Sequence, residues 1–263
     1  MHPILKTAVD AAIKAGNLIL QYADKTSLIN VKNKSPSDVV SEVDHIAEEI
    51  IIRIIQNKYP HHSILSEECG WAREEADFVW VIDPLDGTTN FLKGIPHYAV
   101  SIAIKHQDQL QHGVVYNPAQ DELYTASLGE GATLNKRSIN ISSSHVSGKA
   151  LLVTGISSCS DFNIGQYLGT MKNILESSSV LGIRQSGAAS LDLAYIATGR
   201  HDGFWQFGLK EWDIAAGALL VQEAGGYVCD INGGSSYLHT GNILAANPFI
   251  YDLILSYLQA SID

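Results

Sequence analysis

Two aspartates stand three residues apart in the segment Asp83-Pro84-Leu85-Asp86-Gly87, directly after the apolar run Phe78–Ile82. The apolar run is typical of a short buried strand, and the proline and glycine predict sharp turns after it. Two carboxylates brought together there repel each other unless a cation neutralises them. An all-oxygen set of ligands favours hard cations, Mg²⁺ above all. The segment therefore predicts a Mg²⁺ site, although both aspartates could simply be turn residues.

The next residues, Gly87-Thr88-Thr89-Asn90, have the pattern of a helix start. Backbone N–H groups are exposed at such a start, and the positive end of the helix dipole lies there. Together they favour the binding of a phosphate group. Metal ligands and an anion site thus adjoin within residues 83–90, which is the arrangement that phosphoryl transfer to water requires.

Three other groups of acids stand beside expected turns or helix starts: Asp38 with Asp44, Glu67-Glu68, and Asp213. Each has a structural interpretation as well as a chemical one. Asp44 could close a capping box with Ser41 at a helix start. Asp213 could be an N-terminal charge that its helix dipole favours. Taken singly, these acids leave the choice open.

Helices and strands are mixed along the whole chain. Apolar residues recur with helical spacing at 5–20 and at 47–55, where the pattern stops near Pro60, and further helices are expected at Asp213–Ala224, before Gly225-Gly226, and at Pro248–Leu258. Strands are expected at Phe78–Ile82, Ala99–Ile104, Val114–Tyr116, Glu122–Ala126, Leu151–Gly155 and Tyr227–Asp230. Gly129-Glu130-Gly131 predicts a hairpin rather than a dinucleotide-binding loop. The mixture predicts a layered α/β or α+β fold, and the absence of repeats or linkers favours one continuous unit.

Composition excludes several classes of partner. The net charge of −11 opposes nonspecific binding to nucleic acid or anionic membranes, but not the binding of a small anion at a cation-loaded site. No apolar run approaches the roughly 20 residues that span a bilayer, and Ile4–Leu20 lacks the features of a signal peptide. We therefore expect a cytoplasmic protein. Its three cysteines, Cys69, Cys159 and Cys229, are expected to be free and mostly buried thiols.

The segment Trp80–Phe91 resembles the first signature of the inositol monophosphatase family, and Glu211–Gly217 with Glu223–Gly226 resembles the second. Further matches are Lys34–Asp44, Ser66–Glu68, Arg184–Ala189 and Gly199–Phe204, and the opening Met1-His2-Pro3 is similar to the bacterial SuhB branch. The resemblance covers nearly the whole chain. It implies an alternating α-β-α-β-α sandwich of the inositol monophosphatase and fructose-1,6-bisphosphatase type. It also implies a single domain over residues 1–263 and a homodimer.

The resemblance also implies a set of metal ligands for two or three Mg²⁺ ions. Glu67, Asp83 and the Leu85 carbonyl would hold the first ion. Asp83, Asp86 and Asp213 would hold a second, weaker one, and a third, water-rich position would depend on Glu67. Inhibition by lithium is expected through the weaker position.

The same resemblance implies roles in catalysis and substrate binding. Thr88, hydrogen-bonded to Asp44, would position or deprotonate the attacking water with help from Glu67; we favour this interpretation of Asp44 over the capping box. The Gly87 and Thr88 N–H groups would bind phosphate. The remaining substrate contacts are expected from Asp86, Arg184, Gly187, Ala188, Ala189, Gln206 and Asp213. The family typically has Glu where this chain has Gln206, which predicts an altered preference among polyols.

Hydrolysis of inositol-1-phosphate and related polyol phosphates is the function that the resemblance favours. One alternative is the same chemistry on fructose 1,6-bisphosphate, 3′-phosphoadenosine phosphate or NADP, although no extra basic cluster for a second phosphate stands near the motifs. The other is a partnership with the transcription antitermination machinery, with which the SuhB branch is associated. The acidic balance favours protein contacts over direct RNA binding in that role.

Overall fold

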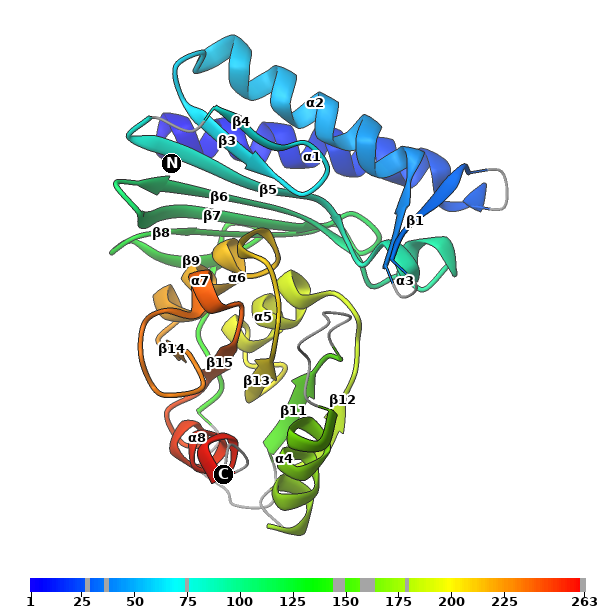
Figure 1. Cartoon of the computed structure of the whole chain (residues 1–263). Helices are drawn as coiled ribbons and strands as arrows, with labels where there is room; N and C mark the ends of the chain where they lie inside the picture. The colour runs from blue at the N-terminus through cyan, green and yellow to red at the C-terminus, as the bar shows by residue number, and fades with distance from the viewer. Residues whose placement is uncertain are drawn as a thin grey trace.

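The computed structural model describes residues 1–26, 29–35, 38–73, 76–143, 150–156, 164–177 and 180–260. Figure 1 shows helices and sheets in alternating layers. A pair of long helices covers a large sheet, a second pair of helices follows, and then come a smaller sheet and a last pair of helices. This is the α-β-α-β-α sandwich that the sequence predicts.

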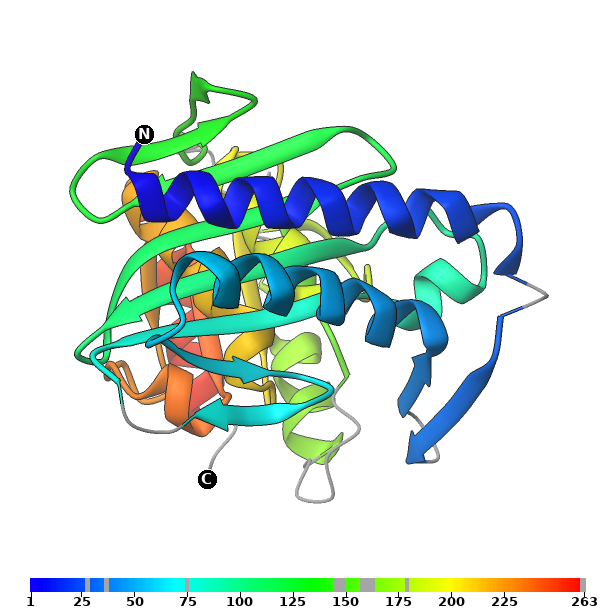
Figure 2. The ribbon, with the colours of Figure 1, turned by 90° about the horizontal axis from the view of Figure 1, so that it is seen from above.

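The outer layer consists of α1 (Pro3–Ala23) and α2 (Glu42–Lys58), which lie across one face of the larger sheet (Figure 2). Both were expected from their apolar periodicity, and their apolar residues are buried against this sheet. A two-stranded sheet of β1 (Val31–Ser35) and β2 (Asp38–Ser41) connects them. The side chain of Asp38 lies outside the described part of the chain.

The larger sheet has eight strands in the order β10-β9-β8-β7-β6-β5-β3-β4. All neighbours pair antiparallel except β3 and β5, which are parallel. In β5, Trp80 and Ile82 face α1 and α2, whereas Val79 and Val81 face the opposite layer. The strands are β3 (Ser63–Ser66), β4 (Gly70–Arg73), β5 (Phe78–Asp86), β6 (Ala99–His106), β7 (Gln109–Asn117), β8 (Glu122–Ser127), β9 (Gly131–Leu134) and β10 (Arg137–Ser138).

The middle layer consists of α5 (Ala189–Ala197), which is almost entirely buried, and α6 (Glu211–Glu223), which is buried from Ile214 to Val221. Close packing here requires glycine: a Cβ at Gly113 would lie 2.9 Å from the Ala216 carbonyl oxygen, and one at Gly217 2.6 Å from Leu193 Cβ. The helix α6 ends where Gly225-Gly226 predicts, and Gly225 has a φ of +93°.

The smaller sheet has five strands in the order β12-β11-β13-β15-β14. The strand β11 is parallel to both neighbours, and β15 is antiparallel to both. The outermost helices, α4 (Ile164–Glu176) and α8 (Tyr251–Ala260), cover its far face (Figure 1), and α7 (Tyr237–Thr240) follows the strand β14. The strands are β11 (Ala150–Thr154), β12 (Val180–Arg184), β13 (Gly203–Gln206), β14 (Tyr227–Cys229) and β15 (Ile243–Ala246).

Every helix and strand expected from the sequence is present, with shifted ends. The largest shift is in β7, which begins at Gln109 rather than Val114 because its first half is partly exposed and carries polar residues. The hairpin at Gly129–Gly131 is confirmed, and its N–H groups donate to Glu223. The sequence pattern did not predict the helices α4, α5 and α7 or the short strands β1, β2, β3, β4, β9, β10, β12, β13 and β15.

Cys69 and Cys229 are free thiols, as predicted. The expectation of burial is wrong for Cys69, which is exposed in the turn between β3 and β4, and Cys159 lies outside the described residues. In the part of the chain that the structure describes, no helix is long and apolar enough to cross a bilayer.

Candidate active site

The sequence predicts that the strand β5 ends before Asp83. In the structure, β5 instead continues to Asp86 through a bulge. Asp83 pairs with Ser101 and Asp86 with Ala99, so Pro84 and Leu85 oppose a single residue of β6. The Leu85 N–H donates to Asp83 Oδ1 at 3.0 Å. Such bulges re-aim side chains. Here the irregularity lets Asp83 and Asp86 reach the same cavity, so the two aspartates are not merely turn residues.

This cavity, which we call the carboxylate cavity, has a volume of about 180 Å³. It lies where the start of α3 (Thr88–Leu92) meets the start of α6 and the segment before α5. Its walls combine most of the predicted site residues with Thr89, which was not predicted. They are Glu67, Asp83, Leu85, Asp86, Gly87, Thr88, Thr89, Gly187 and Asp213.

Three aspartates of the carboxylate cavity, Asp83, Asp86 and Asp213, are harder to ionise than a free aspartate. Burial raises the pKa of Asp83 well above its usual range, and the charges of Glu67, Asp86 and Asp213, with a hydrogen bond to Glu67, raise it further. Burial and the charge of Asp86 raise the pKa of Asp213 in the same way. Burial raises the pKa of Asp86 to about 6, although hydrogen bonds from Ser190 oppose the increase. A bound cation would relieve this mutual repulsion.

The donor chemistry of the cavity fits Mg²⁺. Among the described residues, no group of three or more His, Cys, Asp or Glu side chains is arranged to hold a metal ion as it stands. Mg²⁺ does not need such a group, because it keeps several waters and commonly takes only one or two carboxylates. The buried carboxyls of Asp83 and Asp86, with the partly buried Glu67 and Asp213 beside them, supply hard oxygen donors without a competing sulfur or imidazole ligand in the cavity wall.

Gly87 begins α3, as the sequence predicts, with a φ of +91°. A Cβ at this position would lie 3.0 Å from the His97 carbonyl oxygen and 3.2 Å from Ala188 Cβ, so only glycine fits without displacement. No side chain caps this helix start. Gly87, Thr88 and Thr89 line the cavity, so the first N–H groups of α3 lie at its wall without a side-chain cap, where an anion can accept from them.

Asp44 makes the contacts of both interpretations, the capping box and the favoured hydrogen bond with Thr88. Its Oδ2 accepts a hydrogen bond from the Ser41 N–H at 2.9 Å and closes the capping box of α2. Its Oδ1 accepts from Thr88 Oγ1 at 2.8 Å. The carboxylate is buried, and burial raises its pKa. One side chain thus joins the start of α2 to the wall of the cavity.

Asp213 likewise caps its helix and lines the cavity. The Lys210 N–H donates to Asp213 Oδ2 at 2.7 Å. Two contacts fix this end of α6 on β6: Ser101 Oγ donates to the Trp212 carbonyl at 3.2 Å, and Lys105 Nζ lies 2.5 Å from Glu211 Oε1. The ion pair is largely buried, so it is screened little by solvent.

Two supporting residues were missed in the sequence. The Asn90 amide donates to the carbonyls of His97 and Ser186, both at 2.8 Å, and joins α3 to the segment before Gly187. Ser190 donates to Asp86 Oδ2 from its N–H at 2.8 Å and from its hydroxyl at 2.6 Å. Asn90 stands inside the first signature and could have been noticed. Ser190 is 104 residues from Asp86, and no local pattern connects them.

Four predicted substrate residues do not line the carboxylate cavity: Arg184, Ala188, Ala189 and Gln206. Ala188 and Ala189 are buried at the start of α5, behind Gly187. Arg184 is exposed at the end of β12. Gln206 is half-buried at the end of β13, where its amide lies directly against the Gly155 backbone. These residues stay candidates for contacts with the part of a substrate outside the cavity.

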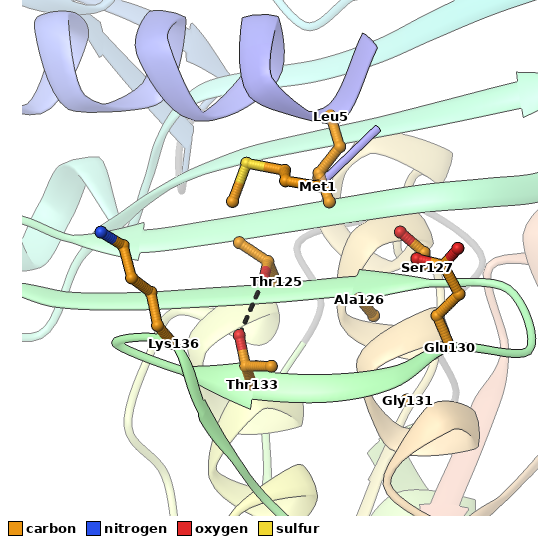
Figure 3. A pocket seen from close by; sticks show the side chains of 9 residues that line it. All are labelled: Met1, Leu5, Thr125, Ala126, Ser127, Glu130, Gly131, Thr133 and Lys136. Carbon is orange, nitrogen blue, oxygen red and sulfur yellow. Dashed lines mark hydrogen bonds between the residues drawn. The ribbon is translucent and has the colours of Figure 1, made fainter. Parts of the chain in front are cut away.

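A second cavity, of about 220 Å³, lies between the start of α1 and the strands β8 and β9 (Figure 3). We call it the hairpin cavity. Its charged residues are Glu130 and Lys136, on opposite sides of Figure 3, and a hydrogen bond of 2.9 Å joins the hydroxyls of Thr125 and Thr133. It is larger than the carboxylate cavity, but it gathers no cluster of acids.

The sequence model of the inositol monophosphatase family matches residues 1–263. The chain belongs to this family. Among the similar family members is the Nus factor SuhB of Pseudomonas aeruginosa, which is 46% identical over 264 residues, 98% of this chain and 97% of that protein.

Solved structures of similar proteins have the same fold as this chain. The extragenic suppressor protein SuhB from Bartonella henselae superposes with a TM-score of 0.93 at 40% identity, covering 98% of this chain and 99% of that one. An inositol monophosphatase from Anabaena (Nostoc) superposes with a TM-score of 0.84 at 35% identity, covering 98% and 95% of the two chains. The inositol monophosphatase family and these neighbours support a phosphatase fold.

Proposed function

We propose that this inositol monophosphatase family member is a Mg²⁺-dependent hydrolase of small phosphate monoesters. One observation carries the proposal: four acids from three separate parts of the sequence meet in the carboxylate cavity, beside the uncapped start of α3. Acids in such a position fit a metal, and the adjoining N–H groups fit a phosphate.

The residues that would hold the metal are Glu67, Asp83, the Leu85 carbonyl, Asp86 and Asp213, all of which line the carboxylate cavity. Mg²⁺ bound there would supply a water of lowered pKa and would stabilise negative charge on the leaving oxygen. Two or three ions would fit the number of acids that face the cavity, and the weaker position is where lithium would compete.

The chain's own residues orient the reacting groups. Thr88 Oγ1 donates to Asp44 Oδ1, so the lone pairs of its oxygen are free to accept a hydrogen bond from the attacking water. The buried Asp44 carboxylate fixes this direction, and Glu67, which also lines the cavity, would assist in removing the proton. The N–H groups of Gly87 and Thr88 would bind the phosphate oxygens.

The substrate class proposed is inositol-1-phosphate and related polyol phosphates. Asp86, with Gly187 beside it, forms the side of the cavity next to α5, where the alcohol part would lie. Arg184, Ala188, Ala189 and Gln206 would contact it farther out, and Gln206 in place of the family's usual Glu favours a broad preference. The inositol monophosphatase of Anabaena supports this class, and a similar structure named inositol monophosphatase-fructose 1,6 bisphosphatase keeps the bisphosphate as the alternative substrate.

A phosphate-release assay tests the proposal. The substrates are inositol-1-phosphate, glycerol phosphate, adenosine monophosphate, fructose 1,6-bisphosphate, 3′-phosphoadenosine phosphate and NADP, each with and without Mg²⁺ and with added Li⁺. We expect turnover of the monoesters that requires Mg²⁺ and that Li⁺ inhibits. Lack of metal-dependent turnover on all six substrates would overturn the proposal.

A second role is suggested by the relatives named Nus factor SuhB. We propose that this protein also acts in the cytoplasm with the transcription antitermination machinery, through protein contacts, as a homodimer of single-domain chains. The test is complementation of a deletion strain by the Asp83→Asn variant. Restored growth without hydrolysis would assign the cellular role to binding, whereas failure of a stable, folded variant would assign it to catalysis.

A further inference from the structure

The helix α2 carries a second buried acid one turn after Asp44. Glu48 follows Asp44 by four residues, so both side chains project from the same face of the helix. Each is essentially inaccessible to solvent. Asp44 reaches Thr88 at the cavity, as described above. Glu48 has no place in the proposed chemistry, yet burying an acid is costly unless hydrogen bonds satisfy it.

Glu48 is satisfied by the turn between β3 and β4, which carries Glu67. Its Oε1 accepts from the Glu68 N–H at 3.0 Å, from the Cys69 N–H at 3.3 Å and from the Ser66 hydroxyl. Its Oε2 accepts from the Cys69 thiol at 2.7 Å. This last bond contributes most to the rise of the Cys69 pKa to about 11. All four donors belong to the residues that flank Glu67.

The residues before and after Glu67 are therefore both fixed. Ser66 precedes it and Glu68 follows it, and both donate to the one Glu48 carboxylate. The Glu67 N–H donates to the Ile82 carbonyl at 3.1 Å, which fixes the turn against β5 one residue before Asp83. Without Glu48, four donors on the turn would lose their acceptor, and the turn would lose its attachment to α2.

We propose that Glu48 is a positioning residue: by fixing the turn Ser66–Cys69 to α2, it holds the Glu67 carboxylate in the carboxylate cavity and sets the affinity for the divalent cation. The inference rests on the proposed function, because it takes Glu67 as a metal ligand. It gives α2 two parallel tasks, since Asp44 orients Thr88 on one wall of the cavity and Glu48 orients Glu67 on another. Residues that orient metal ligands typically change affinity by about 10- to 100-fold when they are replaced.

The alternative is that Glu48 only stabilises the fold. A stability role lowers the melting temperature but leaves the affinity of the folded protein unchanged. The informative measurement is therefore the dissociation constant for Mg²⁺, obtained by calorimetry without substrate, at a temperature where circular dichroism shows each variant to be folded. The kcat and KM at saturating Mg²⁺ are measured alongside.

Four variants make the comparison. Glu48→Ala removes all four hydrogen bonds, and we expect Mg²⁺ to bind about 10- to 100-fold more weakly. Glu48→Gln keeps an acceptor for the two backbone N–H groups and should recover most of the affinity. Cys69→Ala removes one donor and should weaken binding by a few-fold. Glu49→Ala is the matched control, because Glu49 is the next residue of α2 and is exposed.

The outcomes separate this inference from the proposed function. Wild-type protein that binds no Mg²⁺ refutes the proposed function. Wild-type protein that binds Mg²⁺, with Glu48→Ala and Cys69→Ala binding equally well, refutes the role of Glu48. Equal losses in Glu48→Ala and Glu49→Ala would also refute it, since they would reflect charge alone. If Glu48→Ala does not fold, the Cys69→Ala and Glu48→Gln variants decide the question.

Discussion

The carboxylate cavity and the hairpin cavity differ in how their walls are assembled. The hairpin cavity takes its walls from two segments, the start of α1 and residues 125–136. The carboxylate cavity is smaller, yet its walls come from residues 67, 83–89, 187 and 213. Bringing mutually repelling acids together from such distant positions is costly, and a fold keeps such a cluster where it has a use. The carboxylate cavity therefore differs from the hairpin cavity in the cluster of acids that lines it, not in having a larger volume.

The largest expected effect is that of Asp83→Asn. The substitution keeps the size of the side chain and its ability to accept from Leu85, but it removes the charge at the centre of the cluster. We expect phosphate release to fall about 1000-fold or more, with the fold intact. Steady-state kinetics over a range of Mg²⁺ concentrations, with circular dichroism as the control for folding, checks this. Activity within tenfold of wild type would remove the carboxylate cavity from consideration.

The second-largest loss of activity is expected for Thr88→Val. Valine has nearly the shape of threonine, but it has no hydroxyl for Asp44 to orient or for the attacking water to bind. We expect kcat to fall about 100-fold with KM changed little. Thr88→Ser restores the hydroxyl and serves as the matched control. If Ser and Val lose activity equally, the methyl group matters rather than the hydroxyl.

Gln206→Glu should have a smaller effect, on preference rather than rate. The new carboxylate cannot donate a hydrogen bond, and it adds a charge near the expected alcohol position. We expect the rates for inositol-1-phosphate relative to glycerol phosphate and adenosine monophosphate to change by about 3- to 10-fold. Unchanged ratios would mean that Gln206, which does not line the cavity, plays no part in reading the alcohol.

The smallest effect is expected in the hairpin cavity. Thr133→Val removes the hydrogen bond to Thr125, at a cost of about 0.5–1.5 kcal/mol in the free energy of unfolding. Phosphate release should stay within about twofold of wild type. Thermal unfolding and the same kinetic assay measure both quantities. A large loss of activity would show that the two cavities are coupled.

The sequence predicted the residues that line the carboxylate cavity better than the residues that hold them in place. Asp83, Asp86 and Gly87 are local to one segment, so turn chemistry and repulsion suffice to mark them. The resemblance added Glu67 and Asp213, which the structure places in the same cavity. Ser190 and Glu48 were missed because their partners are remote in the chain and become visible only in three dimensions.

Among the helices, the spacing of apolar residues predicted α1 and α2 but did not predict α5. An amphipathic stripe arises only when one side of a helix meets water, and α5 is buried almost all round between two sheets. The strands β3 and β13 were missed for a related reason, since each is only four residues long and too short for an alternating pattern.

The position of α6 between the two sheets has a consequence for the order of folding. Asp213 follows Trp212, whose carbonyl accepts a hydrogen bond from Ser101 across 111 residues of chain, so a long loop must close to bring Asp213 to Asp83 and Asp86. Contacts that close such long loops tend to form late. We expect the larger sheet with α1 and α2 to assemble first and to present an incomplete set of acids. Only a chain whose second half has docked on the first would then bind the cation. Mg²⁺ would therefore stabilise the completely folded molecule and not the partly folded one.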